Sequence, residues 1–130
     1  MNKKIVLLLL LLTTKVFSEW PHENISQAVF SKSVEDRAPI EIVTGADDSL
    51  GKIYFFTNVR NLTGDKITHR WVYKDKVKAE IIFDIKGKRW RVWSSKNLRH
   101  KWTGQWKVEV VNQQNEILLT KTFEFGKENG

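Results

Sequence analysis

The chain has 130 residues, of which 41% are apolar and 28% are charged, and it contains no cysteine. This length is typical of one domain and is too short for a barrel enzyme or a dinucleotide-binding fold. The balance of apolar and charged residues excludes an intrinsically disordered chain. The absence of cysteine excludes disulfides, thiolate metal sites, iron–sulfur clusters and cysteine nucleophiles.

The first eighteen residues have the features of a secretion signal. Two early lysines give a positively charged start, and an unbroken apolar run of eight residues follows from Ile5 to Leu12. As a helix this run rises only ~12 Å, against a hydrocarbon core of roughly 30 Å, so it cannot span a bilayer. We predict cleavage between Ser18 and Glu19, which leaves residues 19–130 as one exported domain, periplasmic or extracellular. The alternative is an uncleaved N-terminal segment that tethers the protein to the membrane.

Cleavage also removes three lysines and no acid, which lowers the formal net charge from +7 to +4. A charge of this size indicates a mildly cationic surface rather than a nucleic-acid-binding protein. The only histidines are His22, His69 and His100, so the sequence lacks the closely spaced pair that usually begins a metal site. We therefore expect no cofactor, no metal, no nucleic-acid partner and no membrane span after cleavage.

From Ile25 onward, apolar and polar residues alternate in short stretches separated by turn signals, which is typical of antiparallel strands with one buried face. The predicted strands are residues 28–34, 40–43, 52–59, 66–74, 77–85, 89–95, 104–112 and 117–125. Residues 45–51 have the composition of a turn. This spacing predicts an all-β fold: a single antiparallel immunoglobulin-like β-sandwich of about seven strands, after an N-terminal signal peptide.

The same alternation predicts which large side chains point inward. His69 and Trp71 share one face of their strand, and Trp90 and Trp106 lie on the apolar faces of later strands. These four residues are candidates for the core, because sandwich domains often bury a tryptophan on a central strand. His69 and Trp71 are alternatively the floor of a pocket. Val77 is expected on the inward face of its strand.

Three stretches resemble a known family: Tyr-Phe-Phe-Thr at 54–57, Thr-His-Arg-Trp at 68–71, and residues 89–106, in which Arg-Trp-Arg-Val-Trp-Ser-Ser-Lys is the most specific run. Over roughly Ile40 to Phe125, the chain is similar to a family of exported bacterial domains of unknown function, number 2914. The resemblance implies an extracytoplasmic β domain without an assigned activity, and it supplies no catalytic residues. Any role is expected to reside in the domain itself.

The candidate binding residues are five basic and aromatic side chains: Arg70, Arg91, Trp93, Lys96 and Trp102. Alternation places Arg70, Arg91 and Trp93 on the polar faces of their strands. Arginine guanidinium groups hold carboxylates or phosphates through paired hydrogen bonds, and an exposed tryptophan can stack on a sugar ring or an arginine. We therefore predict one outward face of Arg70, Arg91 and Trp93 that binds an acidic or glycan polymer.

These patterns favour a monomeric or weakly dimeric, non-catalytic binding module of the cell envelope, whose partner is an envelope protein or an acidic or glycan polymer. The sequence has no nucleophile motif, phosphate loop or metalloprotease motif, so we assign no catalytic residue and do not expect an enzyme. Three alternatives stay open. They are a carbohydrate-binding module with a Trp93 or Trp102 platform, a small hydrolase with two acids in one cleft, and an adaptor whose unpaired first or last strand adds to a partner.

Overall fold

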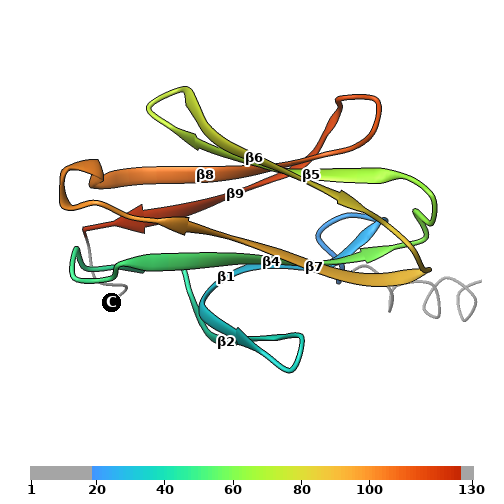
Figure 1. The fold of residues 1–130 in the computed structure, drawn as a ribbon, viewed down its shortest axis with the longest axis horizontal. Helices are drawn as coiled ribbons and strands as arrows, with labels where there is room; N and C mark the ends of the chain where they lie inside the picture. The colour runs from blue at the N-terminus through green and yellow to red at the C-terminus, as the bar shows by residue number, and fades with distance from the viewer. Residues whose placement is uncertain (1–18, 127–130) are drawn as a thin grey trace, which may run out of the picture.

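A computed structural model describes residues 19–126, which form nine strands and one short 3-10 helix. Two sheets pack face to face, and this confirms the predicted immunoglobulin-like β-sandwich (Figure 1). The signal predicted for residues 1–18, with Ser18 at its end, lies outside the described residues. Within the described part of the chain, no helix has the length and apolar character needed to cross a membrane.

The four-stranded sheet has the order β2-β1-β4-β7, and the five-stranded sheet has the order β3-β9-β8-β5-β6. The elements are β1 (Ile25–Glu35), β2 (Ala38–Val43), β3 (Gly45–Ala46), β4 (Lys52–Arg60), β5 (Lys66–Tyr73), β6 (Lys76–Asp84), β7 (Arg89–Asn97), η1 (His100–Trp102), β8 (Gly104–Val111) and β9 (Ile117–Phe125). Strands β4 and β7, and strands β5 and β8, are paired although they are not consecutive in the chain. Such crossing between the sheets is the Greek-key connectivity of immunoglobulin-like sandwiches.

The strand count and one pairing differ from the prediction. The structure has nine strands where about seven were predicted, and one of them, β3, lies in the stretch expected to be only a turn. Strand β3 runs parallel to β9, so the sandwich is not wholly antiparallel. The physical reason is that the chain crosses from β2 to the other sheet here, and its backbone meets donors on the edge of β9. The amide of Glu124 donates to the carbonyl of Thr44 at 3.0 Å, and the amide of Gly126 donates to Ala46 at 2.8 Å.

Large aromatic side chains from both sheets fill the core. Trp71 and Trp106 of the five-stranded sheet and Phe55 of the four-stranded sheet are at most 1% exposed. The ring of Phe30 on β1 lies 4.9 Å from that of Phe55 and 6.1 Å from that of Trp71, measured between centroids. Trp90 is half-buried at the margin of this core. The two sheets are therefore held together by contacts between rings that alternate along each strand.

Val77 does not point inward as the alternation of its strand predicted. The pairing of β5 with β6 shifts between Trp71 and Val72, so that Trp71 lies opposite Ala79 while Val72 lies opposite Val77. This bulge changes the face on which the start of β6 presents its side chains, and Val77 is 53% exposed. A bulge depends on the partner strand, so alternation along one strand does not reveal it.

A chain of hydrogen-bonded polar side chains crosses the core and joins the two sheets. The Oγ of Ser94 on β7 lies 3.1 Å from Trp71 Nε1 and 2.8 Å from His69 Nδ1. The other ring nitrogen of His69, Nε2, lies 2.9 Å from Thr57 Oγ1 on β4. Thr57 Oγ1 in turn lies 3.4 Å from the carbonyl oxygen of Val92. His69, Thr57 and Ser94 are all buried.

The hydrogen-bond partners determine the tautomer of His69. If the proton is on Nε2, Trp71 donates to Ser94, and Ser94 donates to Nδ1 of the imidazole. The imidazole then donates to Thr57, whose hydroxyl donates to the carbonyl of Val92, so every donor has an acceptor. Burial lowers the pKa of His69 from 6.5 to about 3, because the desolvated ring cannot hold a charge. His69 is therefore a neutral part of the core.

We predict that acid weakens the fold through His69. The folded-state pKa lies below the unfolded value, so the unfolded chain takes up the proton first. The stability that neutral His69 contributes is complete above about pH 6.5 and falls by about 1.4 kcal/mol per pH unit as the pH decreases toward 3. The measurement is the free energy of unfolding in denaturant at a series of pH values. His69→Gln, the control, lacks this component, and an identical pH dependence in both proteins would contradict the prediction.

A second prediction tests the aromatic core. Trp71→Ala removes a fully buried indole and the donor to Ser94, and it should lower the free energy of unfolding by about 3–5 kcal/mol. Ile82→Ala, on the exposed face of β6, should change it by less than about 0.5 kcal/mol. Denaturant unfolding of both variants measures the two effects. Equal costs at the two positions would show that Trp71 does not belong to the core.

Candidate functional site

The outer face of the four-stranded sheet carries four arginines. Arg60 on β4 lies directly opposite Arg89 on β7 in the sheet register, and Arg91 follows two residues further along β7. Arg37 comes from the turn between β1 and β2, and its carbonyl oxygen accepts a hydrogen bond from Arg91 Nη1 at 3.1 Å. We refer to Arg37, Arg60, Arg89 and Arg91 as the arginine face.

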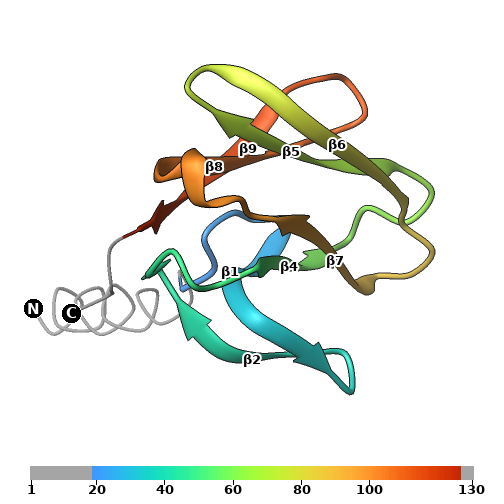
Figure 2. The ribbon, with the colours of Figure 1, turned by 60° about the vertical axis from the view of Figure 1, so that its left-hand side comes forward.

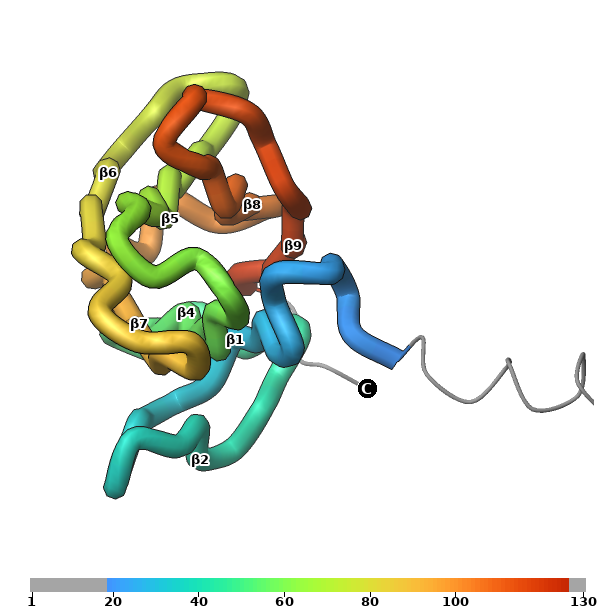
Figure 3. Tube along the Cα trace, turned by 90° about the vertical axis from the view of Figure 1, so that its right-hand side faces the viewer, coloured from blue at the N-terminus to red at the C-terminus, as the bar shows by residue number. Residues whose placement is uncertain are grey.

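The β1–β2 hairpin brings Arg37 to this face. Glu35 pairs with Ala38, so the turn has only two residues, Asp36 and Arg37, with φ angles of 50° and 59°. Two left-handed residues are the hallmark of the type I′ turn, whose twist suits a hairpin. The hairpin bends away from the sandwich, and its turn lies beneath β7 (Figures 2 and 3).

Tryptophans lie beside the arginines. Trp93 is 36% exposed, and its ring stacks on that of Phe56 with 6.2 Å between centroids and 16° between planes. Trp20, which is 45% exposed, lies 4.9 Å from the guanidinium group of Arg60. A cleft of about 260 Å³ is lined by Arg37, Arg89, Trp90, Arg91 and Trp93. The site therefore combines cationic groups with an exposed aromatic surface.

The arginine face has no internal counter-charge. Within residues 19–126, none of its four guanidinium groups forms an ion pair with a carboxylate. Arg60 lies opposite Arg89 in the register, but its Nε donates to Ser26 Oγ on β1 at 3.1 Å, on the side of β4 away from β7. The cations that share the cleft are therefore Arg37, Arg89 and Arg91.

Arg70 does not join this face, so the predicted single face of Arg70, Arg91 and Trp93 is wrong. Strand β5 belongs to the other sheet, and Arg70 lies on its outer surface. Its Nε donates to Glu80 at 3.1 Å and its Nη1 donates to Glu109 at 3.3 Å. These contacts, the hydrogen bond to Glu80 above all, raise the pKa of Arg70. Its guanidinium group is occupied by carboxylates of the same sheet.

Lys96 and Trp102 form a separate cluster where the loop after β7 packs against β6. The cationic groups of Lys78, Lys96 and Arg99 lie 5.5, 5.2 and 5.2 Å from the indole ring of half-buried Trp102. Burial lowers the pKa of Lys96, and the nearby charges of Arg99 and Lys78 lower it further. Because the indole is surrounded by cations of this chain, Trp102 presents less open ring surface to a ligand than Trp93 does.

Other chemistry-bearing residues are dispersed. His69 is enclosed in the core, while the ring of His100 lies 3.9 Å from the carboxylate of Asp48 in an exposed loop. The part of the chain that the structure describes contains no group of three or more histidines and acids arranged to hold a metal ion. The arginine face is therefore the most developed site for recognition of a ligand.

Arg91 and Trp93 were predicted from the sequence as binding residues, whereas Arg37, Arg60, Arg89 and Trp20 were not. Arg89 shares the alternation of Arg91, so its position was available from the sequence. Arg37 and Trp20 join them only because the hairpin bends and the N-terminal segment passes the end of β4. No local pattern predicts either arrangement.

The fold and this face define an immunoglobulin-like β-sandwich domain with a cationic, aromatic outer surface. Residues 64–125 match the family described as Protein of unknown function (DUF2914), and this match confirms the resemblance found in the sequence. The match covers β5 to β9 and includes Arg89, Arg91 and Trp93, but it begins after the predicted start near Ile40. No curated protein matches the chain.

We predict that the left-handed backbone conformation of Arg37 lowers the free energy of unfolding. Its left-handed φ of 59° is easier for glycine than for any side-chain-bearing residue. Arg37→Gly should therefore leave the free energy of unfolding unchanged or raise it by up to about 1 kcal/mol, as measured in denaturant. Arg37→Val, with a branched Cβ at the same φ, should lower it. A Gly variant that is clearly less stable would show that the arginine side chain supports the hairpin.

Proposed function

We propose that this chain is an exported, non-catalytic binding module of the cell envelope, and that its arginine face holds an acidic glycan polymer. The observation that carries the proposal is that Arg37, Arg89 and Arg91 line one cleft together with Trp93, and that neither they nor Arg60 have a carboxylate partner among the described residues. The matched family has no assigned activity, so the proposal rests on the chemistry of the arginine face.

The comparison with Arg70 makes the unpaired arginines informative. Arg70, on the outer surface of the five-stranded sheet, is paired with two carboxylates from neighbouring strands, Glu80 and Glu109. The arginines of the arginine face have no such carboxylate partners among the described residues. Arginine forks bind carboxylates and phosphates through two parallel hydrogen bonds, so groups on a ligand are the natural partners of this face.

Trp93 favours a glycan over other polyanions. Its indole lies nearly parallel to the ring of buried Phe56, which is directly opposite on β4, and part of the indole stays exposed. A flat, immobilised ring of this kind packs against the apolar face of a sugar. The adjoining cleft is small, at about 260 Å³, which suits a short segment of a polymer lying across the sheet more than a whole drug-sized molecule.

The test is a titration of intrinsic tryptophan fluorescence with two polymers of similar length, polygalacturonate and neutral dextran. We expect saturable quenching by polygalacturonate and none by dextran. Arg91→Ala should weaken the apparent affinity at least about tenfold, since a hydrogen bond to a charged group is lost. Trp93→Ala should abolish most of the quenching. Lys76→Ala removes one charge from the other sheet and is the matched control, which should bind as the wild type does.

The possible outcomes separate the alternatives. Equal responses to dextran and polygalacturonate would support a neutral carbohydrate-binding module instead. Binding of polygalacturonate that is equally weakened by Arg91→Ala and Lys76→Ala would reduce the interaction to net charge and overturn the proposed site. Absence of any response to polygalacturonate and to a phosphodiester-linked glycan would overturn the proposal.

A further inference from the structure

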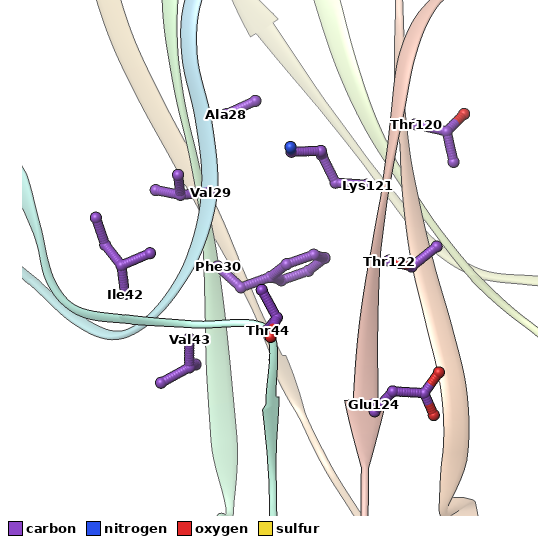
Figure 4. Close-up of a pocket in the computed structure, with 10 residues that line it drawn as sticks. All are labelled: Ala28, Val29, Phe30, Ile42, Val43, Thr44, Thr120, Lys121, Thr122 and Glu124. Carbon is purple, nitrogen blue, oxygen red and sulfur yellow. The ribbon is translucent and has the colours of Figure 1, made fainter. Parts of the chain in front are cut away.

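A groove of about 540 Å³ lies between the two sheets, at the edge of the sandwich opposite β7. Figure 4 shows the side chains that line it. Phe30 on β1 and Ile42 and Val43 on β2 form one wall, and residues 120–122 of β9 form the other. The groove is thus distant in the sheet order from β7, which carries two residues of the arginine face.

The groove exists because β3 covers only one end of β9. Gly45 and Ala46 pair with Glu124 and Phe125, and the preceding residue, Thr44, already leads back toward β2 in the other sheet. Within the described chain, β9 has no further strand partner along this edge. The uncovered part of the edge, residues 117–122, is about 20 Å long.

The backbone of the uncovered edge offers hydrogen bonds to an incoming strand. The amide of Glu124 points to this edge, because it donates to the carbonyl of Thr44 at 3.0 Å. Backbone groups alternate in direction along a strand, so those of Thr122 and Thr120 point to the same edge. An unpaired edge of this kind is a template for another strand.

Apolar side chains of β1 and β2 line one side of the groove, and the other side carries threonines and two charged residues, Lys121 and Glu124. The carboxylate of Glu124 accepts a hydrogen bond from Gln105 at 3.1 Å, so Lys121 supplies the charge in the groove that a ligand can pair with. Phe30 is 3% exposed at its base, whereas Ile42 at the rim is 55% exposed. Lys121 occupies the inward-facing register of β9 that Phe123 also occupies, and its side chain extends into the groove toward Ala28 (Figure 4). The ammonium group of Lys121 forms no ion pair with another described residue, so a carboxylate flanked by apolar side chains complements it.

We propose that the β9 edge binds an extended segment of a partner protein, which adds to the five-stranded sheet as a further strand. The segment places apolar side chains over Phe30 and an acidic side chain on Lys121, and its backbone pairs with Thr120 and Thr122. Strand addition of this type obtains affinity from the main chain and specificity from alternate side chains. The inference does not depend on the arginine face.

The test uses fluorescein-labelled peptides of about eight residues in which valine alternates with small polar residues. One peptide has a central glutamate, and its matched partner has lysine at that position. Fluorescence anisotropy with the wild-type protein should show saturable binding of the glutamate peptide, at least tenfold tighter than of the lysine peptide. Lys121→Glu should reverse this preference. Amide hydrogen exchange should slow at Thr120 and Thr122 when the glutamate peptide is bound.

Two variants at Thr122 distinguish the contribution of the backbone amide to binding from that of the side chain. Thr122→Pro removes the edge amide but no hydrogen bond to β8, and proline is accepted on edge strands. It should weaken binding of the glutamate peptide at least tenfold, whereas Thr122→Val keeps the amide and should bind as the wild type does. Circular dichroism and thermal unfolding verify that both variants are folded. Lys121→Glu provides an independent result if the proline variant does not fold.

Three results would overturn the proposal. One is absence of saturable binding of the glutamate peptide up to about 1 mM. Another is equal binding by the Thr122→Pro and Thr122→Val proteins. The third is self-association of the wild type in sedimentation experiments that Thr122→Pro abolishes, because a second copy of this chain would then occupy the edge.

Discussion

The hydrogen-bonded chain from Trp71 through Ser94 and His69 to Thr57 determines how the two sheets of this protein meet. It connects β5 of one sheet to β4 and β7 of the other, and each of its members is buried. A buried polar group without a partner costs about 1–3 kcal/mol, so a shift of either sheet leaves several groups unsatisfied at once. Aromatic and aliphatic side chains of both sheets pack together in the core, but these hydrogen bonds select one alignment of the sheets.

The same alignment decides what the outer face presents. Strand side chains alternate, so Ser94 in the core requires Trp93 and Arg91 to point outward from β7. Thr57 in the core likewise places Arg60 on the outer face of β4, opposite Arg89. The proposed glycan-binding surface is therefore the reverse side of the buried network. A change that disturbs the network is expected to disturb the arginine face as well.

The two side edges of the sandwich offer different interactions. Strand β7 lies at one edge of the four-stranded sheet and carries Arg89 and Arg91 of the arginine face. At the other edge, the chain leaves β9 uncovered after a two-residue pairing and exposes backbone groups above an apolar floor. Charge dominates the chemistry of the arginine face, and backbone hydrogen bonding dominates that of the β9 edge. The glycan-binding proposal and the strand-addition proposal are therefore independent of each other.

The sequence by itself determined the class of the fold and the inward or outward direction of most strand residues. Trp71, Trp106 and His69 lie inside because alternation with a period of two is a local property, which neighbouring residues along one strand establish. Long-range pairing decided the rest. Arg70 and Arg91 have similar patterns, but they lie on different sheets, and Arg37 joins Arg91 through a hairpin that bends beneath β7. The bulge that exposes Val77 and the crossing that forms β3 also depend on partner strands, and residues along a single strand do not encode which strand becomes its neighbour.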